Sequence, residues 1–248
     1  MRFTVFSIKC YRLPNWISYW SENPRLFGIV MEQSTGYFAK SIMQKSILKP
    51  GLRILDFGCG PGYLTKHLTE SCNSYVGVDI SENYIQTCKT LFTNTPNYQF
   101  ICLYPQQGTS GLATANLLAE SFDLIIINSV IQYFPSKMLV KELLENCKKL
   151  LAPRGTILLA DVVTHDKGLF EDALAVFKHS IQNGYCWAFL QFMYRARVSG
   201  YNETRKKQPL LSITAVEIET MCKQLELNCM LLPGCTLQSS RNTYAISF

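Results

Sequence analysis

Short apolar runs alternate with helical patterns between residues 52 and 161. Five of the runs are rich in aliphatic and aromatic residues and predict strands: residues 52–57, 75–79, 98–103, 122–128 and 156–161. Apolar positions at helical spacing lie between them, which predicts βαβ units around a parallel sheet. The run at 122–128 is apolar enough for a strand that is buried on both faces.

Polar residues at the starts of the helical patterns indicate where helices begin. Ser81 precedes a pattern that we expect it to cap. The side chains that would share the buried face of this helix are Tyr84, Ile85, Cys88, Leu91 and Phe92. Thr214 and Glu217 form a capping-box pattern at a later helix. Residues 229–232 and 243–248 then predict two last strands, an antiparallel pair at the sheet edge.

Two aromatic-rich segments lie outside the alternation. Residues 1–50 precede the first strand, and residues 165–211 interrupt the pattern after the fifth. Aromatic side chains of this density predict buried clusters, which could form a satellite core or a dimer contact. Both a monomer and a homodimer are compatible with the sequence.

Composition narrows the class of protein. Apolar residues make up 48% of the chain and charged residues 17%, as in a globular domain. Apolar stretches stay below the roughly 18 to 20 residues of a membrane-spanning helix, and the first ten residues lack the pattern of a secretory signal. The ten cysteines form no C-x-x-C pair. We therefore expect reduced thiols in a cytoplasmic protein without a metal site.

A glycine-rich turn, Asp56-Phe57-Gly58-Cys59-Gly60-Pro61-Gly62, follows the first predicted strand. Open α/β sheets bind nucleotides at such strand ends, where glycine lets the backbone approach a ligand closely. The spacing is G-x-G-x-G rather than the G-x-G-x-x-G of dinucleotide-binding proteins. The preceding carboxylate of Asp56 would repel a pyrophosphate but suits a cofactor with an ammonium and a sulfonium.

With this acidic-x-G-x-G-x-G motif the sequence resembles the class I S-adenosylmethionine-dependent methyltransferases. The Pro153-Arg154-Gly155 turn before the fifth strand and the pattern of the C-terminal end match the same family. The resemblance implies an α/β, Rossmann-like methyltransferase fold. Its sheet is mostly parallel and seven-stranded, with helices on both faces, an N-terminal helical cap and an insertion after the fifth strand.

The family resemblance also implies the site that binds S-adenosylmethionine and releases S-adenosylhomocysteine. The cofactor-binding residues it gives are Asp56, Gly58, Cys59, Gly60, Gly62, Asp79, Ile80 and Asn128. Asp79 ends the second strand, where the family places an acid that accepts hydrogen bonds from the ribose hydroxyls. Many members carry a further acid after the third strand for the adenine amino group, but residues 102–105 offer none. Tyr104, Gln106 or backbone groups remain as alternatives.

The segment after the fourth strand bears on the acceptor. Residues 128–136 lack the Asn-Pro-Pro-aromatic motif of nucleobase amine methyltransferases, and the chain has no Pro-Cys pair for pyrimidine C5 chemistry. The run resembles small-molecule and natural-product methyltransferases instead. By this resemblance residues 1–50 are a cap, residues 51–248 the cofactor-binding domain and residues 165–211 a lid-like insertion. The acceptor would be a small molecule undergoing O-, N- or C-methylation.

Two other functions remain as alternatives. The net charge is +6, and its densest basic stretch is at residues 195–207. Such a stretch is usually a solvated surface, although an RNA methyltransferase could use it to contact phosphates. A protein that binds the cofactor without catalysing transfer is the second alternative. We expect neither a nucleic-acid nor a membrane partner.

His165 is the candidate catalytic residue. It follows the fifth strand, close to the expected acceptor. An unperturbed histidine titrates near neutrality, which suits a general base for a hydroxyl acceptor. An exposed loop position is the other interpretation of this histidine, and an amine or carbanion acceptor can react without a dedicated base.

Overall fold

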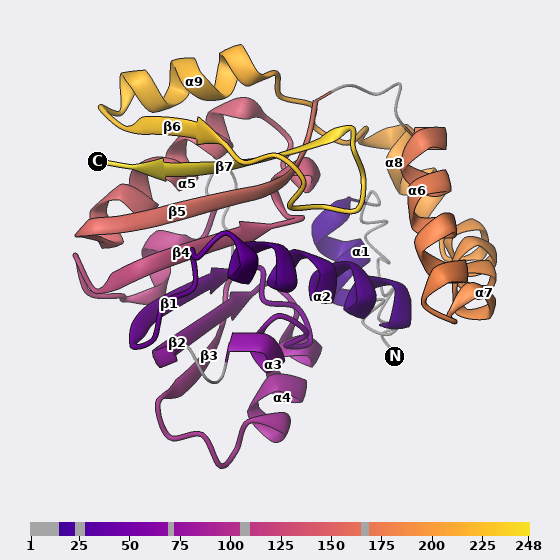
Figure 1. Ribbon diagram of the computed structural model, residues 1–248, viewed down its shortest axis with the longest axis horizontal. Coiled ribbons are helices and arrows are strands. Elements are labelled where there is room, and N and C mark those ends of the chain that lie inside the picture. Colours follow the sequence, from indigo (N-terminus) through magenta and orange to yellow (C-terminus); the bar gives the residue numbers. More distant parts are fainter. Residues whose placement is uncertain (1–14, 23–27, 69–71, 105–109, 165–168) are drawn as a thin grey trace, which may run out of the picture.

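The computed structural model describes residues 15–22, 28–68, 72–104, 110–164 and 169–248, which contain one seven-stranded sheet (Figure 1). The strands are β1 (Leu52–Phe57), β2 (Cys72–Asp79), β3 (Tyr98–Cys102), β4 (Phe122–Asn128), β5 (Leu151–Val163), β6 (Asn228–Leu231) and β7 (Arg241–Ser247). Their order is β3-β2-β1-β4-β5-β7-β6. The first five are parallel, and β7 is antiparallel to both β5 and β6. The predicted Rossmann-like methyltransferase fold is confirmed.

Helices cover both faces of the sheet. One face carries α2 (Gly28–Gln44), α3 (Thr65–Leu68) and α4 (Glu82–Leu91), whose apolar side chains share a buried cluster with Ile54, Leu124 and Leu158. The other carries α5 (Lys137–Leu150) and α9 (Ala215–Gln224), packed on the opposite side chains of the same strands. Two short 3-10 helices, η1 (Leu112–Ala115) and η2 (Ile131–Tyr133), complete this layer. The sheet is therefore the middle of three layers.

A group of helices lies beyond the carboxyl ends of the parallel strands, at the right of Figure 1. It consists of α1 (Trp16–Glu22), α6 (Leu169–Gln182), α7 (Cys186–Val198) and α8 (Tyr201–Lys207). Trp16 is 2% exposed, and its ring centroid lies 5.0 Å from that of Tyr133 and 5.2 Å from that of Tyr201. Aromatic residues of the two extra segments thus pack on each other and on η2.

The boundaries of several elements differ from the expected ones. β2 begins at Cys72, three residues earlier than expected. β5 begins at Leu151, five residues earlier than expected, because Leu151 already pairs with Phe122 before a register shift. Ser81 makes no side-chain cap bond, although its helix begins there. Leu91 is 56% exposed rather than on the buried face, because α4 ends at this residue.

Two non-glycine residues at the carboxyl edge have left-handed backbone. Asp161 has φ 60° and lies in a bulge of β5, where the pairing with β7 shifts between Leu159 and Val162. Ser129 has φ 59° and follows β4 directly. A bulge redirects the side chain it carries, and left-handed backbone is uncommon for residues other than glycine. Both residues lie at the sheet edge where this fold class binds its ligands.

The capping box of α9 gives a first test. The Thr214 hydroxyl accepts from Glu217 N at 3.3 Å, and Thr214 N donates to Glu217 Oε2 at 3.0 Å. We expect Thr214→Ala to lower the free energy of unfolding by about 1 kcal/mol, measured by urea denaturation. Thr87→Ala is the control, since this exposed hydroxyl only bonds the Asn83 carbonyl within α4. Equal losses in both variants would contradict a capping role.

Candidate cofactor and acceptor site

The glycine turn joins β1 to α3 and lies over the end of β2. Gly58, Gly60 and Gly62 all have positive φ, at 82°, 54° and 84°. Gly58 N donates to the Val78 carbonyl at 2.7 Å, which holds the turn against the neighbouring strand. A Cβ added to Gly58 would lie 2.3 Å from Val130 Cγ2, so glycine is required for the segment after β4 to approach.

Asp79 connects β2 to this turn. Its Oδ2 accepts from Gly60 N at 2.9 Å, and its Oδ1 accepts from Ser81 N at 2.8 Å. Burial raises the pKa of Asp79 to about 6, against the lowering effect of the backbone donors of Ser81 and Gly60. The backbone N–H of Ile80 also lowers the pKa of Asp79. A carboxylate accepts about four hydrogen bonds, so the side chain retains capacity for a ligand hydroxyl at the turn.

Asp56 lies beneath the turn, with 3% of its surface exposed. Tyr75 Oη donates to its Oδ2 at 2.7 Å and accepts in turn from Thr65 Oγ1 at 2.9 Å. Burial raises the pKa of Asp56 to about 7, Tyr75 lowers it, and Asp79 raises it again. A direct contact between Asp56 and the cofactor remains a prediction, because the contacts observed are internal.

The other predicted cofactor residues take different positions. Cys59 is buried, and its thiol and that of Cys88 lie 3.7 Å and 3.3 Å from the Gly60 carbonyl. Ile80 packs against the main core from a partly buried position. Asn128 is partly buried at the end of β4, opposite Ala160. The turn, Asp79 and Asn128 therefore share one edge of the sheet, whereas the Cys59 side chain packs in the buried cluster that also contains Cys88.

A carboxylate missed by the sequence reasoning lies near the end of β3. Glu82 begins α4, and its Oε2 accepts from Tyr104 Oη at 3.1 Å. The Gln86 and Tyr104 side chains and the Cys102 thiol lower the pKa of Glu82. Its only signal in the sequence was its place in the first turn of a helix next to Asp79. Gln106 lies outside the described residues.

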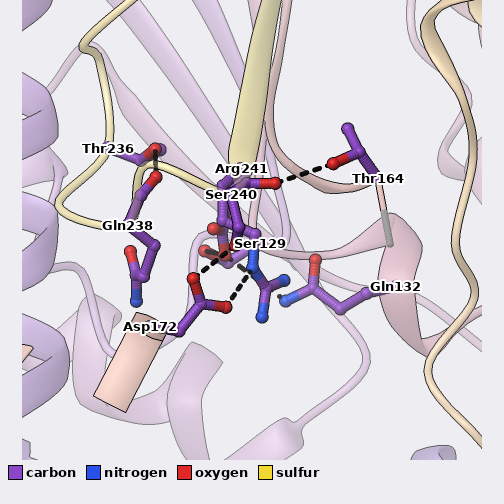
Figure 2. A network of polar contacts seen from close by, with 9 residues as sticks. Ser129, Gln132, Thr164, Asp172, Thr236, Gln238, Ser240 and Arg241 are labelled. Carbon is purple, nitrogen blue, oxygen red and sulfur yellow. Dashed lines mark hydrogen bonds and ion pairs between the residues drawn. The ribbon is translucent and has the colours of Figure 1, made fainter. Parts of the chain in front are cut away.

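A second polar group lies at the ends of β4, β5 and β7 (Figure 2). Ser129 Oγ donates to Asp161 Oδ2 at 2.6 Å, and Gln132 Nε2 lies 3.5 Å from the same oxygen. Arg241 Nε donates to Asp172 Oδ2 at 2.9 Å, with both side chains about 10% exposed. Thr164 Oγ1 donates to the Ser240 carbonyl at 2.8 Å, and Ser240 Oγ donates to Asp172.

We name this group the acceptor-edge cluster; it consists of Ser129, Gln132, Asp161, Asp172 and Arg241. Burial and the neighbouring charges have opposite effects on the pKa of its carboxyl group at Asp161. Desolvation raises the pKa of Asp161, while the charge of Arg241 and the Ser129 hydrogen bond lower it. Three atoms of the cluster are buried without a hydrogen-bond partner among the described residues: Gln132 Oε1, Asp161 Oδ1 and Arg241 Nη1. Unsatisfied buried groups of this kind are costly in isolation.

The remaining features do not add to the site. His165 lies outside the described residues, so its role stays a prediction. The described part of the chain contains no group of three or more potential metal ligands. None of its helices is both long and apolar enough to cross a bilayer. Two surface depressions, one along α4 and β3 and one between the carboxyl ends of α5 and α9, lie away from the glycine turn and the cluster.

The close approach of Gly58 to Val130 can be tested without a ligand. Gly51 is a matched control, since it has φ 83° and nothing within 4 Å of an added Cβ. Both Gly51→Ala and Gly58→Ala carry the left-handed strain of about 1 kcal/mol. We expect Gly58→Ala to lose about 1 to 3 kcal/mol more, because Val130 has to move. Equal midpoints in urea unfolding of the two variants would contradict this.

Comparison with solved structures supports the fold. The chain superposes on an S-adenosylmethionine-dependent methyltransferase of Leishmania major with a TM-score of 0.59 and 14% identity, over 93% of this chain and 81% of that one. It superposes on magnesium protoporphyrin IX methyltransferase of Synechocystis PCC 6803, solved with bound S-adenosylmethionine, with a TM-score of 0.57 and 13% identity. This match covers 93% of this chain and 94% of that one.

Sequence comparison identifies a methyltransferase domain in the chain. Residues 55–157 match the family model described as a methyltransferase domain. A probable non-canonical nonribosomal peptide synthetase of Salinispora arenicola is 33% identical over 44% of this chain and 1% of its own length. An uncharacterized methyltransferase of Schizosaccharomyces pombe is 28% identical over 46% of this chain and 40% of its own length. The chain thus spans only a part of these curated relatives. Residues 55–157 thus form a methyltransferase domain, and the chain has the Rossmann-like methyltransferase fold of the solved structures.

Proposed function

We propose that the chain transfers the methyl group of S-adenosylmethionine to a small-molecule acceptor that binds beyond β4 and β5. The observation that carries this proposal is the aromatic packing over that edge. Trp16 and Tyr19 of α1 are buried against Tyr133 of η2 and Tyr201 of α8, next to the acceptor-edge cluster. A bordered site with a few convergent polar groups suits a small ligand.

The donor site follows from the turn and the two carboxylates. Asp79 holds the ribose hydroxyls, the glycine turn admits the methionine portion, and Glu82 is positioned to receive the adenine amino group. Asn128 ends the adjacent strand and borders the path to the acceptor. The helices α6 to α8 serve as the lid that excludes water during transfer.

Methyl transfer depends mainly on how the protein positions the donor and the acceptor. Methyl transfer is an in-line displacement, in which a lone pair of the acceptor attacks the methyl carbon opposite the sulfonium. Holding the two reactants in line supplies much of the rate. The chain's part is to fix the donor at the turn, to orient the acceptor beside it, and to take up a proton when the acceptor carries one.

Relatives support a small acceptor over a nucleic acid. The Salinispora relative is a probable nonribosomal peptide synthetase, and a Metarhizium majus relative, 31% identical over 45% of this chain and 4% of its own length, is a peramine synthetase. The basic residues between 195 and 207 lie on α7 and α8, largely exposed to solvent. Binding of RNA by these residues, lost at high salt, would favour the alternative acceptor.

The test of transfer uses labelled donor and a small-metabolite extract. We expect a product heavier by one methyl group, together with S-adenosylhomocysteine, both detected by mass spectrometry. Asp79→Asn should weaken S-adenosylhomocysteine binding by about 10- to 100-fold, the range for hydrogen bonds to a charged group. Donor binding without a methylated product, in either the metabolite or an RNA fraction, would favour a protein that binds the cofactor without transfer.

Proton release tests the donor site independently. The pKa values of Asp79 and Asp56 are raised to about 6 and about 7, so both carboxyls are partly protonated near pH 6.5. Ribose hydroxyls donating to Asp79 favour its ionised form and lower its pKa on binding. Binding of S-adenosylhomocysteine should therefore release protons at pH 6.5 and almost none at pH 8.5, where both groups are already ionised.

This release is measured by calorimetry in buffers that differ in ionisation enthalpy. Asp79→Asn should lose the Asp79 share of the release, and the affinity of the wild-type chain should fall as the pH drops through 6. The same number of released protons in the variant would exclude Asp79 as the group that titrates.

A further inference from the structure

Among the described residues, only one oxygen of the Asp161 carboxylate has hydrogen-bond partners. Its Oδ2 has the Ser129 hydroxyl at 2.6 Å and the Gln132 amide nitrogen at 3.5 Å. Its Oδ1 is buried and has no hydrogen-bond partner among the described residues. The left-handed backbone of Asp161, at φ 60°, aims the side chain from the β5 bulge toward Ser129. Strained backbone with an unsatisfied polar atom is typical of functional positions.

The carboxylate of Asp161 lies close to the glycine turn. Its partner Ser129 immediately precedes Val130, and Val130 is the residue that packs on Gly58. β1, β4 and β5 are adjacent in the sheet, so Gly58, Ser129 and Asp161 follow one another along its carboxyl edge. A group bound at Asp161 Oδ1 is thus one strand away from the segment that contacts the turn.

The charges around Asp161 favour a positively charged ligand. Two carboxylates, Asp161 and Asp172, face one guanidinium, Arg241, which leaves a formal charge of −1. Tyr133 of η2 and Tyr201 of α8 also face Asp161, and burial raises the pKa of both phenols, so they stay neutral. The unsatisfied atoms of the cluster are two acceptors, Asp161 Oδ1 and Gln132 Oε1, and one donor, Arg241 Nη1. An ammonium group offers several N–H donors and the complementary charge.

We propose that Asp161 binds the acceptor as a primary amine and takes its proton before methyl transfer. This inference rests on the proposed function and names its substrate class. The ammonium N–H donates to Asp161 Oδ1, and the proton passes to that oxygen, which frees the nitrogen lone pair. The lone pair forms the new N–C bond while the C–S bond breaks. The products are S-adenosylhomocysteine and a protonated methylamine.

Arg241 is a positioning residue in this scheme. Its guanidinium is fixed by Asp172 of α6 at 2.9 Å, and its charge opposes the effect of burial on the Asp161 carboxyl. The ion pair thereby links the start of the inserted helices to the proton acceptor on β5. Arg241→Lys should retain most of the turnover and Arg241→Gln little, since only lysine keeps the charge.

The test uses benzylamine and benzyl alcohol as matched probes on the chain saturated with S-adenosylhomocysteine. The wild-type complex should bind benzylamine about 10- to 100-fold more tightly than the alcohol, measured by calorimetry. Asp161→Asn and Asp161→Gly should bring this ratio close to one, and both residues tolerate left-handed backbone. Asp123→Asn is the control, because its carboxylate pairs with Arg53 at the opposite edge of the sheet.

The outcomes separate the two proposals. A wild-type chain that fails to bind S-adenosylhomocysteine would contradict the proposed function, whatever the probes do. Intact cofactor binding with no benzylamine preference, or a preference that survives in both Asp161 variants, would overturn the role of Asp161 alone. With S-adenosylmethionine, labelled methylbenzylamine should form with the wild-type and Asp123→Asn chains and fall at least about 100-fold in Asp161→Asn.

Discussion

The arrangement of the carboxyl edge depends on the close contact between Gly58 and Val130. Val130 Cγ2 occupies the place where a side chain at position 58 would begin, 2.3 Å from an ideal Cβ. This contact brings the segment after β4 against the turn after β1, so that a donor bound at one is within reach of a group bound at the other. Asp79 fixes the same turn from β2 through Gly60 N. The side chains of Val130 and Asp79 therefore hold the backbone of the glycine turn in place.

The fold could be predicted from local sequence, and so could the candidate donor turn, because the signals of both are local. A glycine turn after a buried strand and an acid at the end of the next strand are read directly from spacing, and β4 was predicted with its observed bounds. The exposed Leu91 was misassigned because periodicity does not show where a helix ends. The extra residues of β5 depend on pairing with Phe122, which is 29 positions away from Leu151.

The acceptor-edge cluster could not be predicted in this way. Asp161, Asp172 and Arg241 are brought together from β5, α6 and β7, and no short-range pattern connects them. Arg241 is one of 24 basic residues in the chain, and only the antiparallel pairing of β7 with β5 places it opposite Val163. His165 was the candidate base because an unperturbed histidine titrates near neutrality. Desolvation raises the pKa of Asp161, and this environment cannot be inferred from the sequence.

The position of Cys59 has a consequence for the chain's own chemical survival. S-adenosylmethionine is an alkylating agent, and thiolates are among the strongest nucleophiles in proteins. Cys59 is part of the turn that we propose as the donor site, yet its hydrogen bond with Cys88 and its burial raise the pKa of the thiol. A thiol kept in its neutral form, directed inward toward the Gly60 carbonyl, resists alkylation. The packing below the turn thus protects the enzyme from methylating itself.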